Sequence, residues 1–422
     1  MSGVIEGEVT PGFEPVRDAF TRNFAEGLEI GAAFSAWRGD EMIVDLWGGL
    51  ADRDSGRPWQ PDSLQVIFSG SKGITAICLW LLLDRGLLEL EAPVCGYWPA
   101  FGKPEIFVRH ILSHTARLPG IETPTRWEEM LDHRLMAQRL ETQMPFADPR
   151  VGLTYHPVTY GWLCGELLRQ IDGRTLGRFL AEEIAAPLDL DLWIGLPEAE
   201  EPRVTTLYGD GAWGRGSRNA IVPTAEQAAA DPVYSAIWYN PPLFGPSFDR
   251  WNARSLHAAE MPGANAIASA RSVAKLYGKL ATGGAGLVSA PTIRRATAEL
   301  ADQIDLINGD RRRYAAGVNL QIETMEFGPP ADAFGHGGAG GSVHGAWPTQ
   351  GIGFSYAMNR LVDGPDPRAA RLLAALYQAM DGKGPLAAVP ASLALHDKGP
   401  ALGHQLKAAL IDQRIQWRGT RY

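Results

Sequence analysis

The hydrophobic and polar positions near the N-terminus change from a helical to an extended pattern. Apolar residues recur at helical spacing through 15–28, and Pro15 suits a helix start, so a helix is predicted there. Two short apolar runs at 32–37 and 42–47 are separated by Arg-Gly-Asp-Glu, which predicts a β-hairpin. The chain therefore begins with a helix and the first strands of a sheet.

Helical periodicity dominates the middle of the chain. Apolar spacing of three and four residues predicts helices over 69–88, 127–143, 160–171, 176–184 and 269–282. Residues 201–261 are instead rich in Gly, Pro and aromatic residues without a clear period. Long loops are expected in that segment.

The strand pattern returns towards the C-terminus. A glycine-rich stretch at 334–347 leads into 351–358, which predicts a strand, and 367–380 predicts an amphipathic helix. Residues 385–422 are interpreted as a C-terminal extension with a helical part at 403–415. Strands at both ends around a helical middle predict a split α/β domain, 1–62 and 263–384, with an inserted mainly helical domain with long loops, 63–262.

Composition and charge narrow the choice of partners. The chain has 422 residues and a formal net charge of -9, and its Lys and Arg residues form no stripe, so nucleic acid is not expected as a partner. The longest apolar stretch, 74–83, is far shorter than the ~20 residues of a membrane helix, so no membrane partner is expected. No basic run followed by an apolar stretch opens the chain, and a cytoplasmic protein is expected. Nothing in the sequence decides the oligomeric state.

Three cysteines, Cys78, Cys95 and Cys164, lack the spacing of metal ligands and are expected to be thiols that pack in the core. His110 and His114 stand four residues apart without a third ligand, so structural packing is favoured over a metal site. The chain also lacks a G-x-S-x-G elbow and a G-x-x-x-x-G-K-[ST] phosphate loop. No cofactor is expected.

The candidate chemistry begins at Ser69-Gly70-Ser71-Lys72, an S-x-x-K motif. Its spacing places a hydroxyl and an amine on one face of a helix, where the amine can accept the hydroxyl proton. Ser69 follows the extended run 64–68, so it stands where that run turns into a helix, and the helix dipole there disfavours the ammonium form of Lys72.

A second copy of the motif lies in the predicted helix 269–282. It consists of Ser272 and Lys275, without a turn before the serine. Lys275 is expected to be a solvated residue on the helix surface. We therefore assign the chemistry to Ser69 and treat Ser272 as a decoy.

Further segments give the motif its context, namely Asp-Leu-Trp-Gly-Gly at 45–49, Asp-Arg-Gly-Leu-Leu at 84–88, Val-Arg-His-Ile-Leu-Ser-His-Thr at 108–115 and Ala-Arg-Ser-Val-Ala at 270–274. Together with the Ser69 motif they resemble the serine β-lactamase-like and penicillin-binding-protein superfamily, in particular family VIII carboxylesterases and class C β-lactamases. The resemblance covers most of the chain. It implies a serine β-lactamase-like fold, with an antiparallel sheet flanked by helices.

The resemblance implies a catalytic tyrosine at Tyr155, in the segment Tyr-His-Pro-Val-Thr-Tyr-Gly-Trp-Leu at 155–163. A buried tyrosine beside a cationic lysine is expected to have its pKa lowered, so Tyr155 and Lys72 should titrate as a coupled pair. Which of the two holds the proton stays open. Pro157 stands where class C β-lactamases usually have an asparagine, and it offers no side-chain hydrogen bond, which weakens the β-lactamase interpretation.

The family's Lys-Thr-Gly motif is matched by 334–340, where His336 replaces the lysine. Because a histidine is largely neutral at physiological pH, the site is expected to lack the permanent cation that holds a substrate carboxylate. The resemblance implies an oxyanion hole made by the backbone N–H groups of Ser69 and Ala339. It also favours substrate binding by His336, Gly337 and Gly338, although His336 could instead only hydrogen-bond within its strand pair.

The predicted activity is a serine carboxylesterase that hydrolyses neutral, small-molecule carboxylic esters through an acyl-enzyme on Ser69, with Lys72 and Tyr155 as catalytic partners. An aromatic cluster is a candidate pocket wall: Trp238, Tyr239, Phe244 and Trp251. The open alternatives are a β-lactamase or D-amino peptidase-type amidase, an acyltransferase of the same fold, and a non-catalytic scaffold or binding protein.

Overall fold

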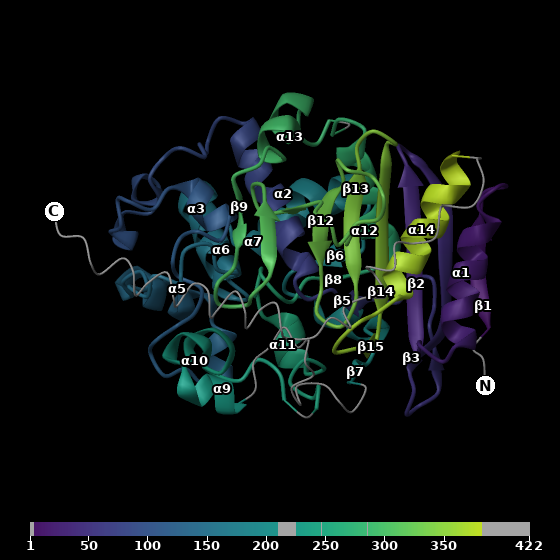
Figure 1. Ribbon diagram of the computed structural model, residues 1–422, viewed down its shortest axis with the longest axis horizontal. Helices are drawn as coiled ribbons and strands as arrows, with labels where there is room; N and C mark the ends of the chain where they lie inside the picture. Colours follow the sequence, from purple (N-terminus) through teal and green to yellow (C-terminus); the bar gives the residue numbers. More distant parts are fainter. Residues whose placement is uncertain (1–3, 210–224, 246, 285, 382–422) are drawn as a thin grey trace, which may run out of the picture.

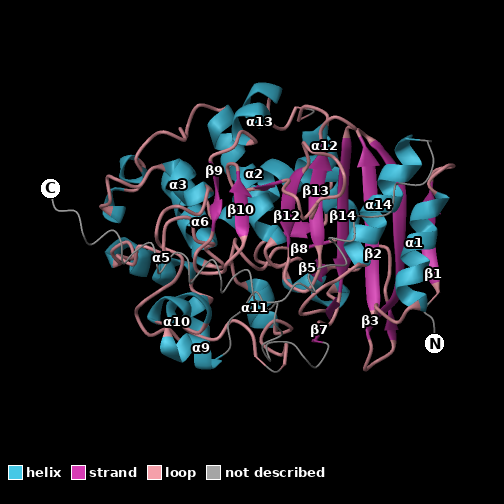
Figure 2. Ribbon diagram, in the orientation of Figure 1, coloured by secondary structure: helices cyan, strands magenta, loops and turns pink. Residues whose placement is uncertain are grey.

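The computed structural model describes residues 4–209, 225–245, 247–284 and 286–381 (Figure 1). A large antiparallel sheet runs through one side of the molecule, and most of the remaining helices gather on the other side (Figure 2). The strand order is β1-β3-β2-β14-β13-β12-β11-β10-β9, with β4 beside β3. Strands from both ends of the chain therefore share one sheet.

The strands of this sheet are β1 (Ile5–Val9), β2 (Gly31–Arg38), β3 (Glu41–Asp52), β4 (Arg57–Pro58), β9 (Ala301–Ile304), β10 (Arg311–Tyr314), β11 (Asn319–Leu320), β12 (Phe334–Gly337), β13 (Val343–Trp347) and β14 (Ile352–Met358). There are two smaller sheets in the described part of the chain. One has the order β5 (Gln65–Val66), β8 (Ile267–Ala268) and β6 (Leu192–Trp193). The other pairs β7 (Tyr208–Gly209) with β15 (Arg360–Leu361).

The helices are α1 (Glu14–Ala25), α2 (Gly70–Asp84), α3 (Val108–Leu112), α4 (Trp127–Met130), α5 (His133–Thr142), α6 (Thr159–Asp172), α7 (Leu176–Leu180), α8 (Ala186–Leu188), α9 (Ala225–Ala230), α10 (Pro232–Trp238), α11 (Arg254–Ala258), α12 (Ala270–Ala281), α13 (Ala290–Ala296) and α14 (Arg368–Asp381). A π-helical turn, Ala181–Ala185, continues α7.

The predicted hairpin is confirmed by β2 and β3, which pair antiparallel, and β14 pairs with the other edge of β2. Helices α1 and α14 pack on each other over one face of this part of the sheet, where Phe20 and Leu372 share a core with Phe34 and Phe354. Helix α12 covers the opposite face of β14 and β2 (Figure 1). The N-terminal and C-terminal parts of the chain are thereby joined around one sheet.

Helix α2 is the centre of the second part of the molecule. The helix predicted over 69–88 is confirmed as α2, in which every residue from Gly70 to Leu83 is buried. Helix α2 packs against α6 on one side and β12 on the other, and Trp80 donates its indole N–H to the Ala316 carbonyl at 2.8 Å. Because α2 bridges the helices and the sheet, any group at its N-terminus lies where the two parts meet.

Several predicted elements differ from the structure. The helix predicted over 127–143 is two helices, α4 and α5, because Asp132 caps α5 by accepting the N–H of Leu135. The segment 201–261 contains the short helices α9, α10 and α11 rather than loops alone, while residues 210–224 lie outside the described residues. Strands β1, β9 and β10 were not predicted, because short strands with charged side chains show no apolar run, and β11 was not predicted because it has only two residues.

The predicted C-terminal extension, 385–422, lies outside the described residues, and the predicted division at 62 and 263 stays a prediction. In the described part of the chain, no helix combines the length and the apolar character that crossing a membrane requires.

The contact between α12 and β14 tests how closely the fold is packed. A Cβ on Gly353 of β14 would lie 1.9 Å from the backbone nitrogen of Gly278 on α12. We expect Gly353→Ala to lower the free energy of unfolding by about 1–3 kcal/mol, because the helix must move away from the sheet. Gly96→Ala is the matched control, since no atom lies within 4 Å of its added Cβ. Equal urea midpoints for the two variants would contradict this packing.

Candidate active site

Ser69 occupies the turn between β5 and α2. Its neighbour Phe68 has a left-handed backbone conformation with φ of 45°, which costs a non-glycine residue roughly 1–2 kcal/mol. The turn is held by the N–H of Gly70 on the Ile67 carbonyl and by the N–H of Ser71 on the Phe68 carbonyl, both at 2.9 Å. Ser69 is the N-cap residue of α2, yet its hydroxyl does not cap the helix. The strained turn thus leaves the hydroxyl available for chemistry.

Lys72 lies one turn into α2, fully buried. Its Nζ atom is 3.1 Å from Ser69 Oγ and 2.7 Å from each of the carbonyl oxygens of Pro157 and Gly263. No ion pair in the described part of the chain includes Lys72. Burial without a counter-ion holds the pKa of the amine well below its usual value of 10.5.

The contacts of Lys72 fit the neutral amine. A neutral amine has two N–H groups and one lone pair, and the two carbonyl groups can accept both N–H groups. The lone pair is then left for the hydroxyl of Ser69. The geometry therefore suits a base that removes the Ser69 proton.

Tyr155 contacts the same hydroxyl, and its ring centroid lies 4.8 Å from Lys72 Nζ. Its hydroxyl donates to Ser69 Oγ at 2.6 Å, and its backbone N–H donates to the buried Asp305 at 2.9 Å. Burial raises the pKa of the Tyr155 phenol, and neither the hydrogen bond to Ser69 nor the nearby Arg312 offsets this. The predicted lowering of this pKa by a cationic Lys72 is therefore wrong, because burial dominates the electrostatics of both groups. The pKa of Tyr155 is raised and the pKa of Lys72 is lowered, so both shifts favour a protonated phenol beside a neutral amine.

The strand that carries His336 borders the same serine. His336 Nδ1 lies 2.7 Å from the Gly337 carbonyl, so this nitrogen carries the proton and Nε2 is the acceptor. Burial first, and then the nearby Lys72, lower the pKa of His336 to about 3. The ring is thus neutral near neutral pH. Its Nε2 atom is buried and has no hydrogen-bond partner among the described residues.

The glycine-rich end of β12 passes beside the turn of Ser69. A Cβ on Gly338 would lie 2.4 Å from the Ile67 carbonyl oxygen, so only a glycine permits this approach. Ser69 and Ala339 both line the cavity that opens here. This arrangement is compatible with the predicted oxyanion hole, whose two donors remain a prediction.

The cavity has a volume of about 280 Å³ and combines an aromatic wall with the catalytic candidates. Phe68, Trp238, Phe244 and Trp251 line it, and the rings of Phe244 and Trp251 stack with centroids 5.5 Å apart. Tyr239 packs against the core instead. An apolar part of a substrate has a ready surface on this side.

Sequence reasoning missed the polar end of the cavity, where Arg312, Asn319 and Glu326 contribute to the lining. Arg312 lies on β10 with its guanidinium carbon 5.9 Å from the centroid of the Tyr155 ring. A site without a permanent cation was expected. This holds at the position of His336, which is neutral, but it is wrong for the cavity as a whole, because Arg312 also lines it. Because successive side chains of a strand point to opposite faces of the sheet, the sequence could have shown that Arg312 faces away from Arg311 and Arg313. No motif, however, marks β10 as part of the site.

The second S-x-x-K copy is structural. Ser272 Oγ accepts the N–H of Asp191 at 2.8 Å, within the first turn of α12. Lys275 is not a solvated residue as predicted. It is half-buried and donates to the Leu188 carbonyl at 2.6 Å, which fastens α12 to the end of α8.

His110 and His114, for which structural packing was favoured over a metal site, each hydrogen-bond with the backbone. His110 Nδ1 accepts the N–H of Phe107, and His114 Nδ1 accepts the N–H of His156, each at 3.1 Å. Across the described ranges no group of three or more His, Cys, Asp or Glu residues could hold a metal ion.

An antiparallel sheet flanked by helices, with a serine and a lysine at the start of a buried helix, is the serine β-lactamase-like arrangement predicted from the sequence. The chain belongs to the Beta-lactamase family, which matches residues 20–379. It is similar to the esterase/beta-lactamase LipL of Mycobacterium tuberculosis (strain ATCC 25618 / H37Rv), with 34% identity over 370 residues that cover 84% of this chain and 83% of LipL.

Two solved structures are each 36% identical to the chain and cover 89% of it and 100% of their own length. One is a family VIII carboxylesterase with a TM-score of 0.80, and the other is a penicillin-binding protein homologue from Caulobacter crescentus with a TM-score of 0.78. The predicted fold and family are therefore confirmed.

The neutral Lys72 gives a prediction for activity. We expect Lys72→Met to lower ester hydrolysis about a hundred- to ten-thousandfold, the usual contribution of a positioned base. Lys275→Met is the matched control and should keep the wild-type rate, because Lys275 only fastens α12. A fully active Lys72→Met variant would exclude Lys72 as the base.

The same variant tests the pKa of Lys72 through stability. In the unfolded chain the amine binds a proton below pH 10.5, whereas in the folded chain it stays neutral to much lower pH. The free energy of unfolding of the wild type, relative to Lys72→Met, should therefore be highest above pH 10.5 and fall as the pH falls towards the folded pKa. A difference that is constant with pH in urea titrations would show that the folded pKa is not lowered.

Proposed function

We propose that this protein is a serine carboxylesterase that acts on small, neutral carboxylic esters through an acyl-enzyme on Ser69. The observation that carries the proposal is the placement of one hydroxyl, Ser69 Oγ, between Lys72 Nζ at 3.1 Å and the Tyr155 hydroxyl at 2.6 Å, inside a cavity with an aromatic wall. Relatives described as an esterase/beta-lactamase and as a family VIII carboxylesterase support it.

In the proposed first half-reaction, Ser69 Oγ bonds to the ester carbonyl carbon while its proton moves to Lys72. The negative charge on the carbonyl oxygen is met by the backbone N–H groups of Ser69 and Ala339. The bond from carbon to the alkoxide then breaks, and the proton returns from the Lys72 and Tyr155 pair to the leaving alkoxide. The alcohol is released and the acyl group stays on Ser69.

In the second half-reaction, a water molecule loses a proton to the same pair and attacks the acyl carbon. The carboxylic acid leaves, and Ser69 recovers its proton from Lys72. In this scheme the edge of the substrate lies along His336, Gly337 and Gly338. The apolar wall of the cavity includes Trp238. No step requires a cofactor.

The preference for neutral esters rests on two features of the site. His336 is neutral where a lysine would hold a carboxylate, and Pro157 presents only its backbone carbonyl, which Lys72 occupies. Arg312, at the polar end, has the carboxylate of Asp310 3.1 Å away, and the Glu326 carboxyl further offsets its charge. We also place the enzyme in the cytoplasm, which its three free thiols support.

The proposal is tested by p-nitrophenyl butyrate hydrolysis with the wild type, Ser69→Ala and the control Ser272→Ala. We expect Ser69→Ala to lose at least about a thousandfold in rate, because the covalent step requires its hydroxyl, and Ser272→Ala to retain the wild-type rate. Equal rates in all three proteins would refute the assignment of Ser69. Faster turnover of the cephalosporin nitrocefin than of the ester would refute the substrate class.

A further inference from the structure

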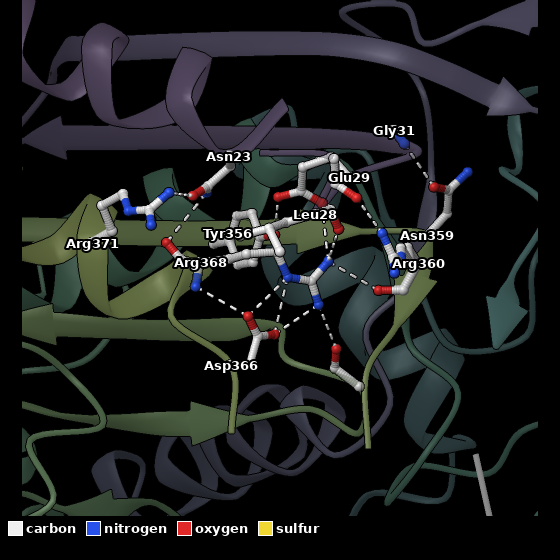
Figure 3. Close-up of polar contacts among 12 residues, drawn as sticks. Asn23, Leu28, Glu29, Gly31, Tyr356, Asn359, Arg360, Asp366, Arg368 and Arg371 are labelled. Atoms are coloured by element: carbon white, nitrogen blue, oxygen red, sulfur yellow. Dashed lines mark hydrogen bonds and ion pairs between the residues drawn. The ribbon is translucent and has the colours of Figure 1, made fainter. Parts of the chain in front are cut away.

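Figure 3 shows the polar contacts of a buried charged cluster, which reaches the glycine-rich loop of the site through Arg368. We call Glu29, Tyr356, Asp366 and Arg368 the Arg368 cluster. Arg368 is the first residue of α14, and its side chain is fully buried. Its guanidinium binds both oxygens of Asp366, with Nε 2.9 Å from Oδ1 and Nη2 2.7 Å from Oδ2, and Nη1 lies 3.0 Å from Glu29 Oε2. Tyr356 donates to the other oxygen of Glu29.

The guanidinium also holds backbone that leads to the site. Arg368 Nη2 donates to the Gly340 carbonyl at 2.9 Å, in a buried contact. Arg368 Nη1 donates to the Arg360 carbonyl at 3.0 Å, and the N–H of Val362 reaches the Gly340 carbonyl at 3.2 Å. The Gly340 carbonyl thus has two donors that come from segments outside its own hairpin.

The loop is shaped to rest on the cluster. Gly340 and Gly341 have φ of 86° and 115°, a region that favours glycine. A Cβ on Gly341 would lie 2.2 Å from Asp366 Oδ2 and 3.0 Å from Arg368 Nη2. The backbone therefore touches the ion pair directly, and a movement of the guanidinium must move the loop.

The charges of the cluster keep the guanidinium in place. Burial raises the pKa of Glu29 to about 7, against the opposing effect of Arg368 and of the hydrogen bond from Tyr356. Removing the guanidinium alone would leave buried carboxyl groups without a partner, so the cluster persists as a unit.

We propose that Arg368 is a positioning residue for the oxyanion hole: it holds the Gly340 carbonyl and thereby fixes the backbone of Gly338 and Ala339 beside Ser69. This inference rests on the proposed function, in which the Ala339 N–H is an oxyanion donor. Arg368 touches neither the substrate nor the nucleophile. Its effect passes through one residue of backbone, from Gly340 to Ala339.

The test compares Arg368→Met and Arg368→Lys with the control Arg371→Met. Arg371 lies on the same helix and binds Asn23 and Glu26, without any described contact to the loop. We expect Arg368→Met to lower kcat for p-nitrophenyl butyrate about ten- to a hundredfold, with KM within about twofold, because a shifted donor weakens binding of the transition state. Arg368→Lys should recover part of kcat, and Arg371→Met should keep the wild-type value.

A second readout separates positioning from stability. A boronic acid forms a tetrahedral adduct on Ser69, and its affinity should weaken in parallel with kcat across the Arg368 variants. If Arg368→Met does not fold, Glu29→Gln serves instead, because it keeps the shape of the cluster and loosens the guanidinium; we expect a severalfold loss in kcat at unchanged KM.

The experiment distinguishes a failure of the positioning role from a failure of the proposed function. A wild-type kcat and boronic acid affinity in the folded variant, with only a lower melting temperature, would overturn the positioning role and leave the proposed function intact. A wild type that hydrolyses the ester no faster than Ser69→Ala would overturn the proposed function and this inference with it.

Discussion

The site depends on burying one amine without a counter-ion. Lys72 sits among the carbonyl groups of Pro157 and Gly263 and the hydroxyl of Ser69, and all three are held by different segments of the chain. Because burial penalises the ammonium form, the same packing that closes the core also favours the neutral amine that the proposed base requires. Helix α2, the Tyr155 loop and the segment before β8 must therefore be assembled together, and the site cannot form before the core does.

Separate elements of the fold position the groups around Ser69. The strained turn at Phe68 presents the hydroxyl, the loop anchored by Asp305 presents Tyr155, and the glycine-rich end of β12 carries the proposed backbone donor. Only the last of these has little side-chain packing of its own, since its residues are small. Its position is set from behind by the Arg368 cluster, which joins the site to helix α14 and to the connection between α1 and β2.

Much of this could be predicted from the sequence, because apolar periodicity marks buried helices such as α2 and α12, and the S-x-x-K spacing marks a shared helix face. The electrostatics of the site could not be predicted, since the pKa shifts of Lys72 and Tyr155 follow mainly from burial by segments far away in the sequence. Arg312 was missed for a similar reason: strand β10 is short and charged, and only its pairing in the sheet brings it to the cavity. Asp132 shows how a capping side chain divides a longer apolar pattern, whereas the short helices after residue 225 form in a segment without a clear period.

The most direct measurement for the neutral Lys72 is the rate at which a fluorophosphonate labels Ser69, followed by the mass of the labelled peptide as a function of pH. Labelling needs the Ser69 proton to be removed, so its rate follows the fraction of Lys72 that is neutral. We expect a rate that reaches its maximum well below pH 10.5 and falls as the pH drops through the lowered pKa of Lys72. A rate that keeps rising up to the usual lysine pKa of 10.5 would show that Lys72 is an ammonium at rest and would contradict the account.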